Sequence, residues 1–222
     1  MMNVEQALLE RKSVRAFLDK PVSVETISHI LACASHAPSG KNTQPWQVAV
    51  TMGKTKELIC QQLLNEFTQD KPKTLDYKYY SDSLTHEFRR RAVECGMLLY
   101  QTLDIDRNDK EKRLNQWARN YHGFDAPVMM YFFADPSIEK GSFLDYGMFL
   151  QSIMLMATSI GLATCPQAAL AEYPHIVKQI LGYPQDLILL CGISLGYEDS
   201  DAKVNSYRTS RAEVTEFAKF FD

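Results

Sequence analysis

The segment from Phe143 to Gly161 limits the fold more than any other part of this sequence. It predicts one long helix that is apolar on nearly every side, and Gly161 is a suitable residue to end it. A helix of this kind has to be buried all round. It therefore either passes through the centre of one domain or packs against a second copy of the chain. The apolar side chains around its circumference are Met148, Leu150, Ile153, Met154, Leu155, Met156 and Ile160.

Other helices and strands alternate loosely along the chain. Apolar runs predict buried strands at 128–133 and 187–195, and a third strand is expected at 47–51. The polar, tyrosine-rich stretch 70–85 has no period and is expected to be a loop. With no repeat or linker, we expect a single α+β domain over residues 1–222, a few-stranded sheet flanked by helices. Further helices are expected at 2–11, 24–37, 54–67, 87–103, 110–121, 173–181 and 213–221.

The composition argues against several functions. The 222-residue chain has a formal net charge of -3, which gives no support for nonspecific nucleic-acid binding. No apolar run approaches the length of a membrane span, so no membrane partner is expected. Residues 1–5 have neither the basic start nor the apolar core of a signal peptide. We therefore expect a cytoplasmic protein.

The cysteines and histidines predict no metal site. The chain has five of each, and neither set has the spacing of metal ligands. No C-x-x-C pair is present, and most of the cysteines have apolar neighbours. We expect buried, reduced thiols at Cys33, Cys60, Cys95, Cys165 and Cys191.

The first segment with recognisable chemistry is Arg11-Lys12-Ser13-Val14-Arg15. In an extended chain alternate side chains share a face, so Arg11, Ser13 and Arg15 project together. Guanidinium groups match the oxygens of phosphates and carboxylates. The segment predicts an anion site, although arginines are also common on ordinary surfaces.

Three further segments carry polar groups suited to a ligand. Residues 37–46 bring Asn42 and Gln44, whose amides both donate and accept, next to Gly40, which allows close backbone approach. Residues 161–168 offer backbone N–H groups after a proline, and residues 205–211 gather two more arginines. Taken separately, each also fits an ordinary turn or solvated loop. The P-loop and dinucleotide-binding glycine patterns are both absent.

Together, and in this order, the four segments resemble the FMN-dependent nitroreductase family over essentially the whole chain. The resemblance rests on Arg11-x-Ser13-x-Arg15, Pro38 to Trp46, Gly161 to Cys165, and Arg208 to Arg211. It implies a central mixed, mostly antiparallel sheet flanked by helices. It also implies that the long apolar helix lies at the interface of a homodimer.

The resemblance also implies residue roles. Arg11, Ser13 and Arg15, with the Lys12 backbone, would contact the FMN phosphate, ribityl chain and pyrimidine edge. Arg208 and Arg211 would complete the phosphate site. A backbone N–H after Pro166, at Gln167 or Ala168, would face the flavin N5 atom. The residues expected to reach the flavin of the other subunit are Pro38, Ser39, Gly40, Asn42 and Gln44.

The implied activity is an NAD(P)H oxidoreductase. FMN would take a hydride from NADH or NADPH and reduce nitroaromatics, quinones or similar electron-poor acceptors by a ping-pong scheme. No catalytic side chain is required. Lys41, Tyr80 and Phe124 are candidate substrate contacts. The alternatives are another flavin chemistry on the same fold (reductive dehalogenation or flavin fragmentation), a non-enzymatic flavin protein, and an unrelated anion-binding domain.

Overall fold

The computed structural model describes residues 2–222 and has a four-stranded sheet at its centre. The strand order is β1-β2-β4-β3, and all three pairings are antiparallel. The predicted α+β fold is confirmed, while the expected mixed sheet contains parallel pairing only at an isolated bridge between Ser13 and Thr164. The strands are β1 (Gln47–Met52), β2 (Val128–Ala134), β3 (Ala163–Gln167) and β4 (Ile188–Gly196).

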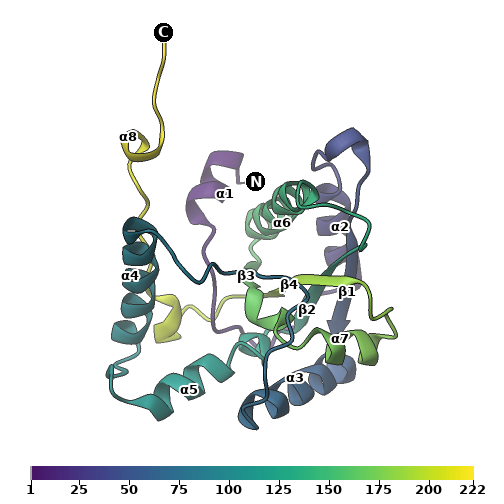
Figure 1. Ribbon diagram of the computed structural model, residues 1–222, viewed down its shortest axis with the longest axis vertical. Helices are drawn as coiled ribbons and strands as arrows, with labels where there is room; N and C mark the ends of the chain where they lie inside the picture. Colours follow the sequence, from purple (N-terminus) through teal and green to yellow (C-terminus); the bar gives the residue numbers. More distant parts are fainter. Residues whose placement is uncertain (1) are drawn as a thin grey trace.

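Helices cover both faces of this sheet (Figure 1). One face packs against α2 and α6, and the other against α3 and α7. Residues of β2 are buried throughout, as expected for a continuously apolar strand between two layers. The α-helices are α1 (Val4–Glu10), α2 (Val24–Ala34), α3 (Gly53–Thr68), α4 (His86–Thr102), α5 (Lys110–Ala118), α6 (Ser142–Ser159), α7 (Pro174–Leu181) and α8 (Val214–Phe217).

Short 3₁₀ helices lie in four of the connections. The first falls in the polar segment before β1, and the third directly follows β3. The second precedes β2 and contains Phe124 in a left-handed conformation, with φ of 56°. They are η1 (Gly40–Asn42), η2 (Gly123–Asp125), η3 (Ala168–Ala171) and η4 (Lys203–Asn205).

Helix α6 is the predicted apolar helix, but it does not run through the centre of the domain. One side packs on α2 and the sheet, where Phe149 and Ile153 are buried. The opposite side leaves Leu144 75% exposed and Met148 40% exposed. The expectation that this helix passes through the centre of one domain is therefore wrong for a single chain, because the helix lies on the surface of the fold.

Three other sequence-based predictions need correction. The strand β3 was not expected, and the helix predicted at 24–37 ends at Ala34. The terminal helix expected at 213–221 is reduced to the four residues of α8. The chain beyond α8 extends away from the body of the protein (Figure 1), so it has no core on which to pack.

Residues 70–85, here called the strap, form the predicted loop and connect α3 to α4. Lys73 pairs with Glu172 at 2.8 Å, and Asp76 pairs with the buried Lys178 at 2.8 Å. The Tyr77 hydroxyl donates to the backbone carbonyl of Leu190 at 2.8 Å. These contacts attach the first half of the strap to Glu172 directly after η3, to α7 and to β4. No helix of the described residues is long and apolar enough to span a bilayer.

Candidate functional site

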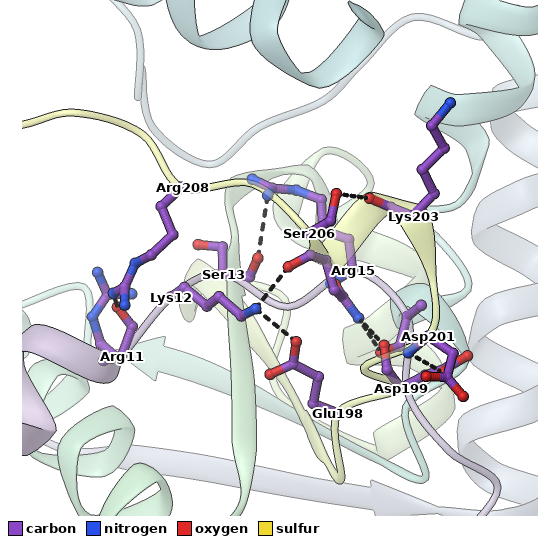
Figure 2. Close-up of polar contacts among 12 residues, drawn as sticks. Arg11, Lys12, Ser13, Arg15, Glu198, Asp199, Asp201, Lys203, Ser206 and Arg208 are labelled. Atoms are coloured by element: carbon purple, nitrogen blue, oxygen red, sulfur yellow. Dashed lines mark hydrogen bonds and ion pairs between the residues drawn. The ribbon is translucent and has the colours of Figure 1, made fainter. Parts of the chain in front are cut away.

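The segment 11–15 is extended, as predicted, and β3 holds it in place. Ser13 bridges to Thr164, and the Val14 N–H donates to the Thr164 carbonyl at 3.0 Å. Lys12 turns toward Glu198, with which its ammonium pairs at 2.7 Å (Figure 2). The contacts with β3 therefore hold segment 11–15 in the extended form that the sequence predicts.

The C-terminal arginines join this segment. Arg208 donates to the carbonyl oxygen of Arg11 at 2.8 Å, and Figure 2 shows the two side chains next to each other. Together the two segments enclose a pocket of about 130 Å³, here called the arginine pocket. Its lining residues are Arg11, Lys12, Ser13, Arg15, Cys95, Tyr207, Arg208, Thr209 and Arg211.

This pocket holds a concentration of positive charge that the protein itself does not neutralise. Across residues 2–222, no carboxylate lies within 4.0 Å of a side-chain nitrogen of Arg11, Arg15, Arg208 or Arg211. The pKa of Arg11 is lowered by partial burial and then by repulsion from Arg211 and Arg208. An anion with several oxygens would relieve that repulsion. The pocket is therefore suited to a phosphate group.

Two residues that the sequence analysis did not select hold Arg15 in this pocket. The Asn205 carboxamide accepts from the Arg15 backbone N–H at 2.8 Å and donates to Ala16 and Asp199 carbonyls. The Arg15 guanidinium donates to the Tyr207 hydroxyl at 3.1 Å. Both residues stand in the segment 205–211 that the sequence analysis singled out. Only their contacts with residues almost two hundred positions earlier show their role.

The segment 39–44, here called the left-handed loop, has an unusual backbone. Lys41, Asn42 and Gln44 have φ values of 53°, 56° and 46°. Side-chain-bearing residues rarely adopt this region, at a cost of about 1–3 kcal/mol each. Such strain persists where the surroundings impose it, and it is concentrated at ligand sites. The Gln44 N–H donates to the Ser39 hydroxyl at 2.9 Å, which closes the loop on itself.

The left-handed loop and the arginine pocket lie at opposite ends of α6. The Gly40 N–H donates to Asp145 in the first turn of α6. The arginine segment bonds instead to Thr164, just beyond the last turn. Eighteen helical residues span about 27 Å. The structure therefore does not bring these two predicted parts of the site together within one chain.

The backbone N–H predicted to face the flavin, at Gln167 or Ala168, lies at the end of β3. This strand forms the sheet edge that binds segment 11–15. The Gln167 side chain is buried and faces away from solvent. It accepts from the Ser194 hydroxyl at 2.6 Å and donates to the Asn120 carbonyl at 2.9 Å. Any ligand contact by Gln167 would therefore come from its backbone, as the sequence analysis expects.

The three candidate substrate contacts have very different surroundings. Lys41 is exposed on the left-handed loop. Tyr80 is 69% exposed on the strap, with its ring centroid 4.6 Å from that of Tyr79. Phe124 is only 2% exposed and packs in a small cluster with Val14 and Cys165. The Phe124 ring thus packs against segment 11–15 from the core side and presents almost no surface to a ligand.

The cysteines are only partly as expected. Cys60, Cys165 and Cys191 are buried, but Cys33 and Cys95 are exposed. Both exposed thiols lie on helices, Cys33 on α2 and Cys95 on α4. Cys95 lines the arginine pocket, and no other cysteine of residues 2–222 does.

Comparison with known proteins places the chain in a family. Residues 8–197 match the Nitroreductase family, and the chain belongs to it. It is 37% identical to a 4-nitrobenzoate reductase of Pseudomonas putida, over 97% of this chain and 94% of that protein.

Solved structures agree with this assignment. The fold is similar to the FMN and NADPH-dependent nitroreductase NfnB of Sphigopyxis sp. strain HMH, with a TM-score of 0.95, 35% identity and full coverage of both chains. It is also similar to the FMN-dependent nitroreductase NfnB of Mycobacterium smegmatis in complex with NADPH. That match has a TM-score of 0.94 and 32% identity, and covers 98% of this chain and 97% of that one. The family predicted from the sequence is confirmed.

Proposed function

We propose that this protein is an FMN-dependent NAD(P)H oxidoreductase that reduces nitroaromatic compounds. The observation that carries the proposal is the arginine pocket, whose crowded guanidinium groups lack carboxylate partners among residues 2–222. The positive charge of the pocket is suited to the phosphate of FMN, and guanidinium groups are good donors to phosphate oxygens. Relatives and structural neighbours along nearly the whole chain bear the names of nitroreductases.

The residues of this chain bind and orient the cofactor. FMN, when bound, supplies the hydride and electron transfer. Arg11, Arg208 and Arg211 would hold its phosphate, and Arg15 is kept in place by Asn205 and Tyr207. The backbone after Pro166 would face the flavin ring, with Gln167 anchored from behind by Ser194. No acid, base or nucleophile from the protein is needed at the reacting atoms.

We propose further that the working form is a homodimer with shared flavin sites. The exposed side of α6 supports this, because it presents Leu144 and Met148 around Gly147. A Cβ at Gly147 would meet nothing within 4 Å in a single chain, which leaves room for a second helix. Burial of such a side against a second copy would remove the apolar surface from water.

A dimer would also complete the site. The left-handed loop cannot reach the arginine pocket of its own chain, because α6 separates them. If two α6 helices pack antiparallel, each loop comes to the arginine pocket of the other chain. The expected contacts from Pro38, Ser39, Gly40, Asn42 and Gln44 would then be made between subunits.

The likeness to relatives guides the choice of donor and acceptor. The named NfnB structures support NADPH as a donor, and the P. putida relative supports a nitrobenzoate-type acceptor. Donor and acceptor would use the same space over the flavin in turn. We place the protein in the cytoplasm, which is supported by five free thiols.

An anaerobic titration tests the proposal. Purified protein should be yellow and release FMN on denaturation. Addition of NADPH or NADH without oxygen should bleach the flavin absorbance, and 4-nitrobenzoate should then restore it. A colourless protein that does not bind added FMN would contradict the cofactor assignment. A yellow protein that neither nicotinamide bleaches would contradict the reductase activity.

A further inference from the structure

We propose that Asp145 is a positioning residue for the cofactor pocket of the partner subunit. It would act by holding the left-handed loop in the shape that reaches across the dimer. The inference rests on the proposed function, because it takes the arginine pocket as the FMN phosphate site and the loop as its complement from the other chain.

The surroundings of Asp145 are unusual for a carboxylate. The residue is 9% exposed, and no lysine, arginine or histidine nitrogen of residues 2–222 lies within 4.0 Å of it. Its Oδ2 atom accepts from the Gly40 N–H at 3.3 Å. A buried charge without a cation needs hydrogen bonds. Its place in the first turn of α6 is favourable for a negative charge but does not require contact with the loop.

The loop depends on anchors outside itself. Inside it, the Asn42 N–H donates to the Ser39 carbonyl at 2.9 Å, and the Gln44 N–H donates to the Ser39 hydroxyl. These bonds close the loop but do not fix it to the fold. The first turn of α6 fixes both ends of the loop to the fold. Asp145 accepts from the Gly40 N–H near one end, and the Tyr146 hydroxyl donates to the Pro45 carbonyl just after the other end.

Loss of the Asp145 acceptor would leave the Gly40 N–H without this partner. The three left-handed residues would then be free to relax to commoner conformations, because strained backbone persists only while its surroundings impose it. The amides of Asn42 and Gln44 would no longer be presented in one arrangement. Ligand affinity would fall, because ordering the loop would have to accompany binding.

The effect should appear in the other subunit. Asp145 lies at one end of α6, and the arginine pocket of the same chain lies beyond the other end. Asp145 is therefore not among the residues that line the pocket of its own chain. It can influence FMN only where its loop arrives, which is the pocket of the partner.

Two variants separate this role from a charge effect on α6. Asp145→Ala removes both the charge and the acceptor, whereas Asp145→Asn removes the charge and keeps an acceptor oxygen. We expect the FMN Kd of the intact dimer to rise about tenfold in Asp145→Ala and to change less than about threefold in Asp145→Asn. Fluorescence quenching of added FMN measures both. Equal changes in the two variants would indicate the helix charge alone and overturn the proposal.

A mixed dimer tests the action between subunits. One differently tagged chain carries Arg11→Ala and the other carries Asp145→Ala. If Asp145 acts on the partner's pocket, both substitutions affect the same flavin site. The other site then combines an unmodified arginine pocket with an unmodified left-handed loop. The purified mixed dimer should then bind one FMN with unmodified affinity. Weak binding at both sites would overturn the proposal, because it would show that Asp145 serves its own chain.

The outcome also separates this inference from the proposed function. If the Arg11→Ala homodimer keeps FMN at unchanged affinity, the cofactor site itself is wrong. If Arg11→Ala loses FMN and Asp145→Ala does not, only the Asp145 role is wrong. Should Asp145→Ala fail to fold, Asp145→Leu fills the buried space without offering an acceptor. Unmodified FMN affinity in a folded Asp145→Leu dimer would overturn the inference.

Discussion

Arg208 donates a hydrogen bond to the backbone carbonyl of Arg11 at 2.8 Å, across a separation of 197 residues. The contact brings two guanidinium groups together in one pocket near Arg211, although like charges repel. A protein gains nothing from this arrangement alone, since partial burial, and then repulsion from Arg211 and Arg208, lowers the pKa of Arg11 and disfavours its charged form. The arrangement becomes favourable once an anion occupies the pocket.

Replacement of Arg11 should release the cofactor. A hydrogen bond to a charged group contributes about 1.5–3 kcal/mol, so Arg11→Ala should raise the FMN Kd about 10- to 150-fold. Equilibrium dialysis or flavin fluorescence would measure the change. Arg113→Ala is a matched control, because its guanidinium lies over the Tyr100 ring and does not line the pocket. Equal FMN affinity in the two variants would contradict the site.

Leu144→Arg should produce a folded monomer without flavin. The side chain is 75% exposed in one chain, so a charge there costs little in a monomer. At a dimer interface the same charge would be buried in apolar surroundings without a partner of opposite charge. Light scattering, circular dichroism and flavin content are the readouts. Leu114→Arg on α5, another exposed leucine, is the control that should remain dimeric. A flavin-loaded Leu144→Arg dimer would be inconsistent with an interface on α6.

Asp76→Asn should destabilise the strap and the fold. The Lys178 side chain is only 2% exposed and pairs with Asp76 at 2.8 Å. Removal of one member of a buried pair leaves an uncompensated charge, at a cost of about 3–5 kcal/mol. Chemical denaturation would measure the loss. Lys178→Met added to Asp76→Asn should recover most of it, and a double variant no more stable than Asp76→Asn would contradict this explanation.

Alkaline pH should destabilise the protein through its buried thiols. Burial raises the pKa of Cys165 and Cys60 to about 11 and that of Cys191 to about 12, from an ordinary 9.0. Well below pH 9 these thiols are neutral in both folded and unfolded chains. Between pH 9 and 11 the unfolded chain ionises first, so stability should fall as pH rises. Unfolding midpoints of Cys165→Ala and Cys33→Ser would test this, with a flatter pH dependence only in Cys165→Ala.

Tyr80→Leu should alter substrate use and spare the flavin. An aromatic contact contributes about 0.5–1.5 kcal/mol, so the KM for 4-nitrobenzoate should rise about two- to tenfold. The Tyr80 ring is exposed on the strap beside Tyr79, and its loss leaves no cavity. FMN content and bleaching by NADPH should be unchanged. A KM equal to that of the unmodified enzyme would remove Tyr80 from the substrate site.

The fold was largely predictable because its strongest elements are marked by apolar composition. The strands β2 and β4 are mainly apolar runs, and α6 is long enough to be identified by composition. The strand β3 was missed because Pro166 stands inside it. Proline is tolerated there because β3 is an edge strand, a position that becomes visible only in the finished sheet.

The candidate site was predictable where its chemistry is local. The alternation of Arg11, Ser13 and Arg15 follows from an extended chain, which the structure confirms. Asn205 and Asp145 were missed because their roles depend on contacts made far along the chain. An asparagine in a loop and an aspartate in a first helical turn are ordinary on their own. No single-sequence pattern distinguishes them from surface residues.

The length of α6 also sets a dilution limit on the enzyme. If the flavin site is shared between two chains as proposed, an isolated chain has the arginine pocket but lacks the contacts from the left-handed loop. Well below the dimer dissociation constant, the concentration of complete flavin sites should then fall with the square of the total subunit concentration. Specific activity measured at very low enzyme concentration would fall below its true value, and excess FMN in the assay would restore it by favouring the assembled form.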